Sequence, residues 1–380
     1  MLSSVDILDR LIAFNTVSRT PNIGLIRYVA ELLTGAGIEC RIVEGPNGEN
    51  ANLYAKVGPD GGGGVMLSGH TDVVPVAGQN WTVDPFRMTA RDGKYYGRGT
   101  TDMKGFVACA VRAMLLSADR PLTKPLHLAL SYDEEIGCVG VRRLLDILDG
   151  APDQPGFCIV GEPTELTVAT GHKGKIAARA VCTGREVHSA LAPQGVNAIH
   201  LATDFVAALR DLQADLAERG AQDPEYDIPY STVHAGVISG GTALNIVPNH
   251  CSVDFEIRHL KADDPEVLMG RVEAAAEAIS KSCPEGCGIA IEIVNRYPGL
   301  DTSADAEIVS FVKSLTGANA TTKVAFGTEG GLFDARLGIP TVVCGPGSMA
   351  QGHKPDEFIE ASQMAACDRF LEALLDRMSA

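Results

Sequence analysis

The 380-residue sequence predicts an α/β protein in which a layered domain carries a smaller α+β domain as an insertion. Three observations favour this fold class. The chain is long enough for two domains. Short apolar strands alternate with helices over its first part and again near its end, which is typical of a layered α/β domain. Between about 172 and 287 the order changes to β-α-β-β-α, which is typical of an antiparallel sheet with helices on one face.

Residues 1–171 are predicted to begin the layered domain. Residues 4–15 have the pattern of an amphipathic helix because Val5, Leu8 and Leu11 fall on one face, and a second helix is expected at 22–36. Short apolar runs bounded by turn residues predict strands. The strands are expected at 38–43, 52–57, 64–67, 126–131 and 157–160, and two further helices at 104–118 and 139–148.

The inserted domain is predicted at 172–287, and residues 288–380 are expected to complete the layered domain. Alternating and apolar runs define the elements in both parts. The insertion is expected to hold strands at 175–183, 230–238 and 250–258 and helices at 197–219 and 265–282. The last part is expected to hold strands at 290–295 and 341–344 and helices at 304–315 and 361–378.

Composition excludes several classes of function. The chain is 45% hydrophobic and 21% charged, with a mean hydropathy of +0.07, as in ordinary globular proteins. No apolar run approaches the roughly 20 residues that span a bilayer. For that reason no membrane partner is expected. The N-terminus lacks a basic region followed by an apolar core, so no secretory signal is expected. A net charge of -16 opposes a nucleic-acid partner, because such proteins concentrate positive charge.

The ten cysteines are scattered, and several lie in apolar runs. Buried, reduced thiols fit this distribution best, which favours a cytoplasmic location. Cys283 and Cys287 have a spacing that allows a metal clip or a disulfide. Structural zinc sites usually have two further ligands nearby and other spacings, so we assign this pair no role.

The stretch around which the chain is organised is Ser68-Gly-His-Thr-Asp72, which follows the apolar run 64–67. In extended chain, residues two apart point to the same side, so His70 and Asp72 share a face. Imidazole is a good zinc ligand, and a nearby carboxylate can fix its tautomer and orientation. Alone the pair is a weak signal, because most such pairs are surface hydrogen-bonding groups.

Similar side chains follow other predicted elements. Asp102 lies in a glycine-flanked loop before a helix, Glu134 and Glu135 follow the strand at 126–131, Glu162 follows the strand at 157–160, and His353 follows the strand at 341–344. Open α/β sheets build their sites at such strand ends. Each residue alone is more often a solvated surface group, a core hydrogen-bonding group or a charged helix start. Their shared context makes a common site the better interpretation.

These residues are the ligands that two zinc ions, roughly 3.5–4 Å apart, require. A carboxylate can bridge both ions, and each ion can be completed by one imidazole and one further carboxylate. We expect Asp102 to bridge, His70 and Glu162 to complete one ion, and Glu135 and His353 the other. A shared water would then lose a proton readily. Glu134 diverges from its neighbour and is free to act as a general base.

The same motifs resemble those of the M20 metallopeptidase family over nearly the whole chain. The resemblance is carried by Ser68-Gly-His-Thr-Asp72, Gly97-Arg-Gly-Thr-Thr-Asp-Met-Lys-Gly105, Asp133-Glu-Glu135, Gly161-Glu-Pro-Thr164 and His353-Lys-Pro-Asp-Glu357. It implies a zinc-exopeptidase-like domain with an inserted ferredoxin-like domain that acts as lid and dimer contact. It also implies a cytoplasmic homodimer with two zinc ions, for which cobalt or manganese can substitute.

The resemblance implies roles for the site residues. The ligands would be those assigned above, with Asp72 orienting His70 and Glu134 as the acid and base. His188 would reach the partner's active site and stabilise an oxyanion. The substrate contacts implied are Asn245, Arg258 and Thr328, although Arg258 alone fits equally well as a salt bridge within its strand. We add the hypothesis that Glu329 pairs with the δ-ammonium of ornithine.

Within the family, the sequence is most similar to the bacterial enzymes of arginine biosynthesis that release acetate from N2-acetyl-L-ornithine. A small-molecule N-acyl amino acid is therefore the expected substrate. Alternatives within the family are a succinyl-diaminopimelate desuccinylase, an aminoacylase or a dipeptidase. A metal-dependent binding protein without turnover is disfavoured by the intact ligand set with Glu134 beside it. A nucleotide binder is disfavoured because no Gly-x-Gly-x-x-Gly turn or phosphate loop is present.

Overall fold

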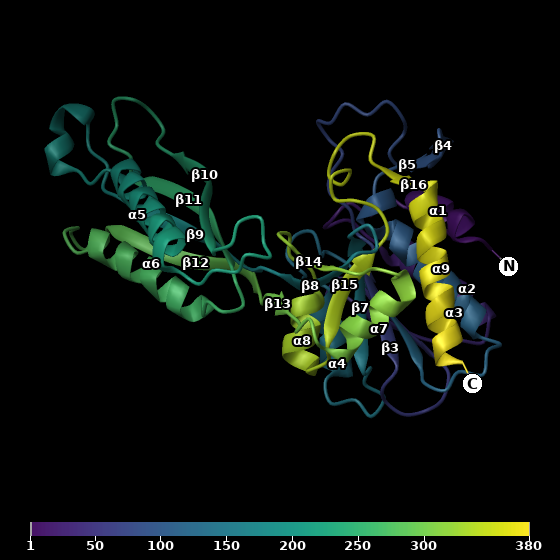
Figure 1. The fold of residues 1–380 in the computed structure, drawn as a ribbon. Coiled ribbons are helices and arrows are strands. Elements are labelled where there is room, and N and C mark those ends of the chain that lie inside the picture. The colour runs from purple at the N-terminus through teal and green to yellow at the C-terminus, as the bar shows by residue number, and fades with distance from the viewer. Residues whose placement is uncertain (1, 380) are drawn as a thin grey trace. The chain divides into compact units, whose positions relative to one another are not determined.

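The structure of the chain, a computed structural model, describes residues 2–379 and contains two compact units (Figure 1). The first unit comprises residues 2–171, 300–323 and 328–379, and the second comprises 172–299 and 324–327. The second unit is therefore inserted into the first. The predicted fold class, a mixed sheet flanked by helices with a second α+β unit, is confirmed.

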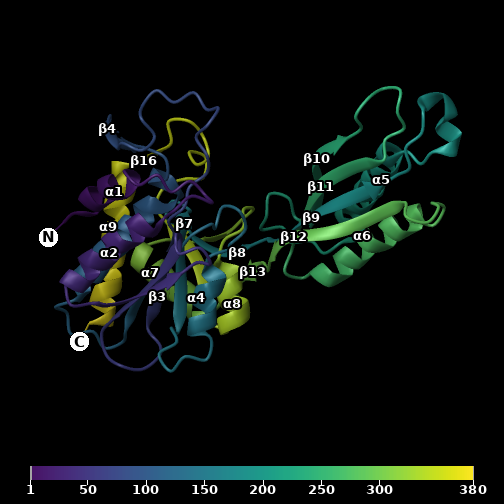
Figure 2. The ribbon, with the colours of Figure 1, turned by 180° about the vertical axis from the view of Figure 1, so that it is seen from behind.

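A mixed nine-stranded sheet forms the middle of the first unit (Figures 1 and 2). Its strands are β1 (Glu39–Glu44), β2 (Ala51–Val57), β3 (Val65–His70), β6 (Leu126–Ser131), β7 (Phe157–Pro163), β8 (Val168–His172), β13 (Leu300–Asp301), β14 (Thr321–Val324) and β15 (Thr341–Gly345). The order is β1-β2-β6-β3-β7-β15-β8-β13, and β14 pairs with β8. β3 runs parallel to β6 and β7, so the carboxyl ends of these three strands meet at one edge.

Helices cover both faces of this sheet. One face is covered by α1 (Ser4–Ile12), α2 (Ile23–Gly35), α3 (Gly105–Ser117), α7 (Glu307–Thr316) and α9 (Ala361–Met378), and the other by α4 (Val141–Leu148) and α8 (Gly330–Leu337). The five helices of the first set share one apolar core with the strands, including Phe106, Leu128 and Leu371. Burial of that apolar area is the main force that holds the layers together.

A small three-stranded sheet joins two loops that lie far apart in the sequence. It consists of β4 (Thr89–Arg91), β5 (Lys94–Tyr96) and β16 (Phe358–Glu360), in the order β16-β5-β4. The backbone N–H of Gly97 continues the contact by donating to the carbonyl of Glu357 at 2.9 Å. The segment before α3 and the loop after β15 are thereby held side by side.

The second unit is an antiparallel sheet with helices on one face (Figure 1). Its elements are β9 (Gly174–Thr183), α5 (Ala198–Arg219), β10 (Thr232–Gly240), β11 (His250–His259), α6 (Pro265–Ser280) and β12 (Gly288–Tyr297). The strand order is β10-β11-β9-β12, which is the order of a ferredoxin-like sheet. Its core is separate from that of the first unit and includes Phe205 against Phe255, with ring centroids 5.5 Å apart.

The predicted start of the final segment at residue 288 is wrong. The strand expected at 290–295 is β12, which pairs antiparallel with β9 and completes the sheet of the second unit. Its Ile289 and Ile291 pack against the core of that unit. The chain re-enters the first unit only at residue 300. An apolar run shows that a strand forms, but the pairing partner depends on contacts that the run itself does not encode.

Local signals set several element ends. Ser3 caps α1 through a reciprocal bond with Asp6, and Asp264 caps α6 just before Pro265. The first helix ends at Ile12 rather than 15. The strands β8, β13, β14 and β16 and the helix α8 were not predicted; all are short, and α8 begins with two glycines. Among the described residues, no helix has the length and apolar character needed to span a bilayer.

Candidate metal centre

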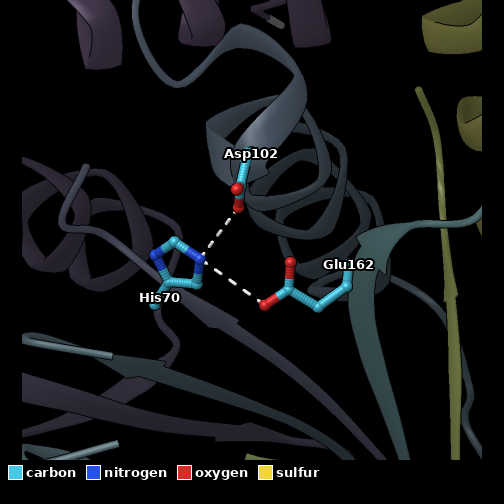
Figure 3. Close-up of side chains that lie close together, drawn as sticks. All are labelled: His70, Asp102 and Glu162. Carbon is cyan, nitrogen blue, oxygen red and sulfur yellow. Dashed lines mark hydrogen bonds and ion pairs between the residues drawn. The ribbon is translucent and has the colours of Figure 1, made fainter. Parts of the chain in front are cut away.

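Two ligand-type residues end neighbouring parallel strands of the large sheet. His70 is the last residue of β3, and Glu162 lies near the end of β7, beside β3. Because these carboxyl ends meet at one edge, the two side chains converge, as Figure 3 shows. Both are buried, with 1% and 3% of their surface exposed.

Asp102 joins them from an irregular turn, residues 100–104, that precedes α3. Its Oδ1 atom lies 3.1 Å from His70 Nε2, and Glu162 Oε1 lies 3.5 Å from the same nitrogen (Figure 3). We call His70, Asp102 and Glu162 the inner cluster. Its ligand atoms lie close enough together to hold a single metal ion.

The other oxygen of Asp102 faces Glu135 and His353. We call Asp102, Glu135 and His353 the outer cluster. His353 Nε2 lies 3.1 Å from Asp102 Oδ2 and 3.1 Å from Glu135 Oε2. Glu135 follows β6, and His353 lies in the loop between β15 and β16. The five side chains predicted as ligands thus come together, with Asp102 shared by both clusters.

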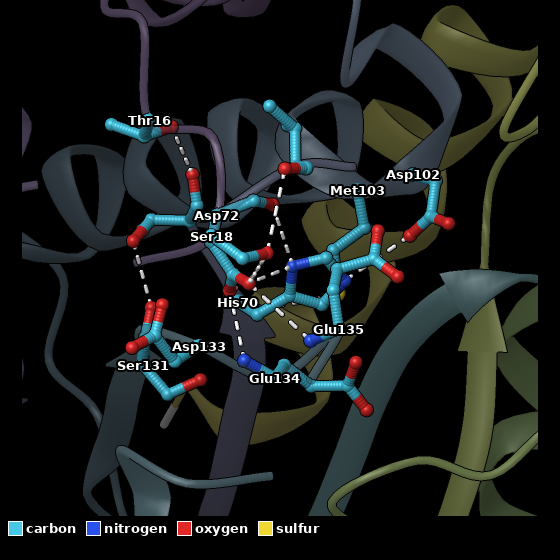
Figure 4. A network of polar contacts seen from close by, with 12 residues as sticks. Thr16, Ser18, His70, Asp72, Asp102, Met103, Ser131, Asp133, Glu134 and Glu135 are labelled. Carbon is cyan, nitrogen blue, oxygen red and sulfur yellow. Dashed lines mark hydrogen bonds and ion pairs between the residues drawn. The ribbon is translucent and has the colours of Figure 1, made fainter. Parts of the chain in front are cut away.

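Asp72 links His70 to the acidic loop after β6 (Figure 4). Its carboxylate accepts the backbone N–H of Glu134 at 3.0 Å and of Glu135 at 3.3 Å, and Ser18 donates to it at 2.8 Å. His70 Nδ1 lies 2.9 Å from the carbonyl of Asp72 but 3.5 Å from its carboxylate. A carbonyl can only accept, so Nδ1 carries the proton and Nε2 is left for a metal. Asp72 therefore orients His70 chiefly through its backbone and both glutamates through its side chain.

The buried carboxyl groups of the site are hard to ionise together. Burial, and then neighbouring carboxylates, raise the pKa of Glu162 and of Glu134 well above the usual value. The same causes raise the pKa of Glu135 to about 7. Asp102 behaves differently: burial opposes its ionisation, but hydrogen bonds to His353 and His70 outweigh burial and lower its pKa.

The two imidazoles show which charge the site favours. Burial opposes protonation of His70, yet Glu162, Asp102 and Asp72 together raise its pKa. Hydrogen bonds to Asp102 and Glu135 raise the pKa of His353 to about 10. Positive charge is thus stabilised between these carboxylates, and divalent cations would supply it more strongly. Two imidazole nitrogens and three carboxylates fit zinc, cobalt or manganese.

Glu134 lies beside the clusters but belongs to neither. Its side chain is buried, with 9% of the residue exposed, and Cys138 Sγ lies 3.4 Å from Oε1. A carboxylate next to a metal centre, with a raised pKa and its backbone fixed by Asp72, has the properties of a general base.

Glu329 and Thr328, two predicted substrate contacts, are buried at the start of α8. Glu329 is 2% exposed; Ser131 Oγ donates to one oxygen at 2.5 Å and Ser68 Oγ to the other at 3.3 Å. The Thr328 hydroxyl accepts the N–H of Gly330 at 2.9 Å. Each oxygen of Glu329 thus accepts one serine hydroxyl within the fold and keeps capacity for a further donor, and its pairing with an ornithine ammonium stays a hypothesis.

The remaining predicted residues lie in the second unit. His188 is exposed, and its Nδ1 accepts the N–H of Ala190 at 3.1 Å. Asn245, also exposed, lies nearby because its carbonyl accepts the N–H of Ser189. Arg258 is half-buried. It makes a salt bridge to Glu256 of its own strand at 3.0 Å, which is the alternative that the sequence left open. It also donates a hydrogen bond to the Tyr297 hydroxyl at 3.1 Å.

Several residues that shape the centre were given no role from the sequence. Ser18 holds Asp72, and Glu357 accepts the backbone N–H of Asp102 at 3.1 Å. Arg98 pairs with Glu357, and Gln79 contacts Arg98. Glu357 and Arg98 stand within the motifs that carry the family resemblance, which was the available signal; Ser18 and Gln79 carry none.

Comparison with known proteins identifies the class. Residues 66–377 match the family described as peptidase family M20/M25/M40. The chain therefore belongs to this family of metal-dependent hydrolases, and the resemblance seen in the sequence is confirmed. It is 35% identical over 379 residues to an acetylornithine deacetylase of Photorhabdus laumondii, covering 98% of this chain and 96% of the relative. It is also 35% identical to an acetylornithine deacetylase of Myxococcus xanthus, covering 96% and 94%.

Solved structures share the fold. An M20 family metallo-carboxypeptidase from Sulfolobus solfataricus superimposes with a TM-score of 0.81 at 18% identity, covering 99% of each chain. A dinuclear metal-binding M20 peptidase from Bacillus subtilis superimposes with a TM-score of 0.66 at 15% identity, covering 99% of this chain and 97% of that one. At these identities the likeness establishes the fold alone.

Proposed function

We propose that the protein is a dinuclear zinc amidohydrolase that converts N2-acetyl-L-ornithine to L-ornithine and acetate in arginine biosynthesis. The observation that carries this proposal is the position of Asp102, whose two oxygens face two separate imidazole–carboxylate pairs. Full-length relatives named acetylornithine deacetylase support the choice of substrate. The cytoplasm is the proposed location, and the ten free thiols are consistent with a reducing compartment.

In the proposed mechanism, bound zinc ions would polarise the acyl carbonyl and lower the pKa of a water. Glu134 accepts the proton of the attacking water and later gives it to the leaving α-amine. Asp72 holds the backbone of Glu134 in place during both transfers. Arg258 is proposed to bind the substrate carboxylate with its forked guanidinium, and Asn245 to contact the substrate beside it.

We also propose that the second unit forms a homodimer. β10 is an edge strand of its sheet, and Val237 and Ile238 on it are 58% and 53% exposed. Grooves of about 460 and 400 Å³ run between this strand and α5, with apolar residues such as Val206 lining both. An exposed apolar edge of this kind is suited to pairing with another chain.

In such a dimer, His188 of the partner subunit would stabilise the oxyanion of the tetrahedral intermediate. His188→Ala and Glu134→Gln subunits, each inactive alone, should then regain activity when mixed, because some sites receive both intact residues. Absence of recovery after confirmed subunit exchange would contradict the shared site.

The substrate is tested by kcat/KM for N-acetylornithine against N-acetylmethionine, succinyl-diaminopimelate and a dipeptide. N-acetylornithine should be preferred, and chelation should abolish turnover until zinc or cobalt is returned. Preference for another substrate would assign the chain to a different activity of the family, such as desuccinylase, aminoacylase or dipeptidase. Full activity in thoroughly chelated protein would contradict the metal centre itself.

A further inference from the structure

The exposed ligand of the outer cluster is held by a side chain outside that cluster. His353 has a φ of 61°, in the left-handed region that residues with a Cβ rarely adopt, so surrounding contacts must hold it there. Its carbonyl accepts a hydrogen bond from Gln79 Nε2 at 2.9 Å. Gln79 comes from the loop between β3 and β4, 274 positions earlier in the chain.

The orientation of the Gln79 amide is fixed from its other end. Its Oε1 atom accepts hydrogen bonds from Arg98 at 2.6 Å and from the Trp81 indole at 3.0 Å. Arg98 is 1% exposed, and its guanidinium carbon lies 5.0 Å from the centre of the Trp81 ring. A reversed amide would place its NH2 group against two donors, so the present orientation directs NH2 toward His353.

The same arginine also reaches the bridging ligand. Arg98 donates to Glu357 Oε2 at 2.6 Å, and Glu357 Oε1 accepts the N–H of Thr101 at 2.9 Å and of Asp102 at 3.1 Å. One network, buried at Arg98 and Glu357, therefore ends at Asp102 on one side and, through the partly buried Gln79, at His353 on the other. The inner ligand His70 is instead held by the Asp72 carbonyl.

We propose that Gln79 is a positioning residue that sets the affinity of the outer ion through His353 and leaves the inner ion unaffected. This inference rests on the proposed two-ion site. Outer contacts that fix a metal ligand typically change affinity about 10–100-fold when removed. Gln79 contacts the backbone of His353 and not its imidazole. Replacing Gln79 should therefore shift the position of the His353 ring without removing it as a ligand.

Gln79→Glu is the sharpest variant. Glutamate keeps the oxygen that Arg98 and Trp81 bind and is nearly equal in size, but it cannot donate to the His353 carbonyl. Metal-free protein is dialysed against buffered Zn²⁺ over a range of free concentrations, and zinc per chain is measured. We expect one of the two ions to bind about 10–100-fold more weakly than in wild type and the other to bind with unchanged affinity.

A second background shows whether Gln79 acts through His353. His353→Ala removes the outer ligand, and Gln79→Glu added to it should leave the affinity of the remaining ion unchanged. A further loss in that background would mean that Gln79 supports the site at large, and would overturn the inference. Equal weakening of both ions by Gln79→Glu alone would overturn it as well.

Thr82→Val is the matched control. Thr82 lies in the same loop as Gln79, and its hydroxyl donates to Asp356 at 2.9 Å, so it joins the same two loops without contacting His353. The zinc affinities of Thr82→Val should match those of wild type. If Thr82→Val weakened zinc binding as much as Gln79→Glu does, the effect would come from loosening the contact between the two loops, and the inference would be overturned. Wild type binding fewer than two ions would overturn the dinuclear proposal and this inference with it. Two ions bound equally well by wild type and Gln79→Glu would overturn the inference alone.

Discussion

The inner and outer clusters share Asp102 but are built in different ways. His70 and Glu162 stand on adjacent strands and are 1% and 3% exposed. The side chain of His353 is 48% exposed and stands on a loop in a left-handed conformation. A ligand at a strand end takes its position from the sheet, whereas a ligand on a loop depends on side chains that hold the loop. We therefore expect the inner cluster to tolerate changes around it better than the outer cluster.

The largest expected effect separates the two neighbouring glutamates after β6. Glu134→Gln should lower kcat by about 10²–10⁴-fold while both ions remain bound, because a general base is lost and no ligand is changed. Glu135→Gln should instead weaken the outer ion and leave the inner ion in place. Turnover and bound zinc measured on the same samples distinguish these outcomes. Near-normal turnover of the fully loaded Glu134→Gln protein would remove Glu134 from the mechanism.

The next effect concerns the buried pair that supports both clusters. Arg98 and Glu357 are each 1% exposed and 2.6 Å apart. Arg98→Met leaves the Glu357 charge buried without its main partner, so the free energy of unfolding of the metal-free protein should fall by about 3–5 kcal/mol.

Urea unfolding measures this loss, with Arg336→Met as the control. Arg336 pairs with Asp146 at the surface, where the two side chains are 39% and 64% exposed, and such pairs contribute about 0–1 kcal/mol. If both variants lost the same small amount, the network around Arg98 would not be a structural support for the metal centre.

The sequence was sufficient to predict that His70, Glu135 and Glu162 come together, because each stands next to a local signal. The strands that end near His70, Glu135 and Glu162 are short, mainly apolar runs, and such runs mark buried strands without any knowledge of the fold. Since parallel strands place their carboxyl ends at one edge, the convergence of these side chains followed from strand positions alone.

The supporting residues could not be predicted in this way. Gln79 and His353 are separated by 274 positions, and Glu329 and Ser68 by 261, so their contacts exist only once the sheet has formed. The same reason explains the misassigned strand at 288–297: its apolar pattern was correct, but β9 as its partner is set by the topology of the second unit.

The smallest expected effect compares two buried histidines on the neighbouring strands β3 and β6. His70 lies among carboxylates that raise its pKa, whereas burial lowers the pKa of His127 to about 4. The neutral His127 ring forms a hydrogen bond at each nitrogen. Nε2 donates to the Gly63 carbonyl at 3.0 Å, and Nδ1 accepts from the Tyr54 hydroxyl at 2.6 Å.

Unfolding returns His127 to its ordinary pKa of 6.5. Between pH 6.5 and about 4 the unfolded chain therefore binds more protons than the folded chain, and the free energy of unfolding decreases as the pH is lowered. His70 has the opposite sign, because its raised pKa adds stability at low pH that is lost as the pH rises. The difference between wild type and His127→Gln therefore isolates His127. Measured by urea unfolding of metal-free protein at pH 7 and 4.5, wild type should lose about 2 kcal/mol more than the variant. If wild type and His127→Gln lost the same free energy of unfolding between pH 7 and 4.5, His127 would be protonated in the folded protein. Burial would then not keep its ring neutral.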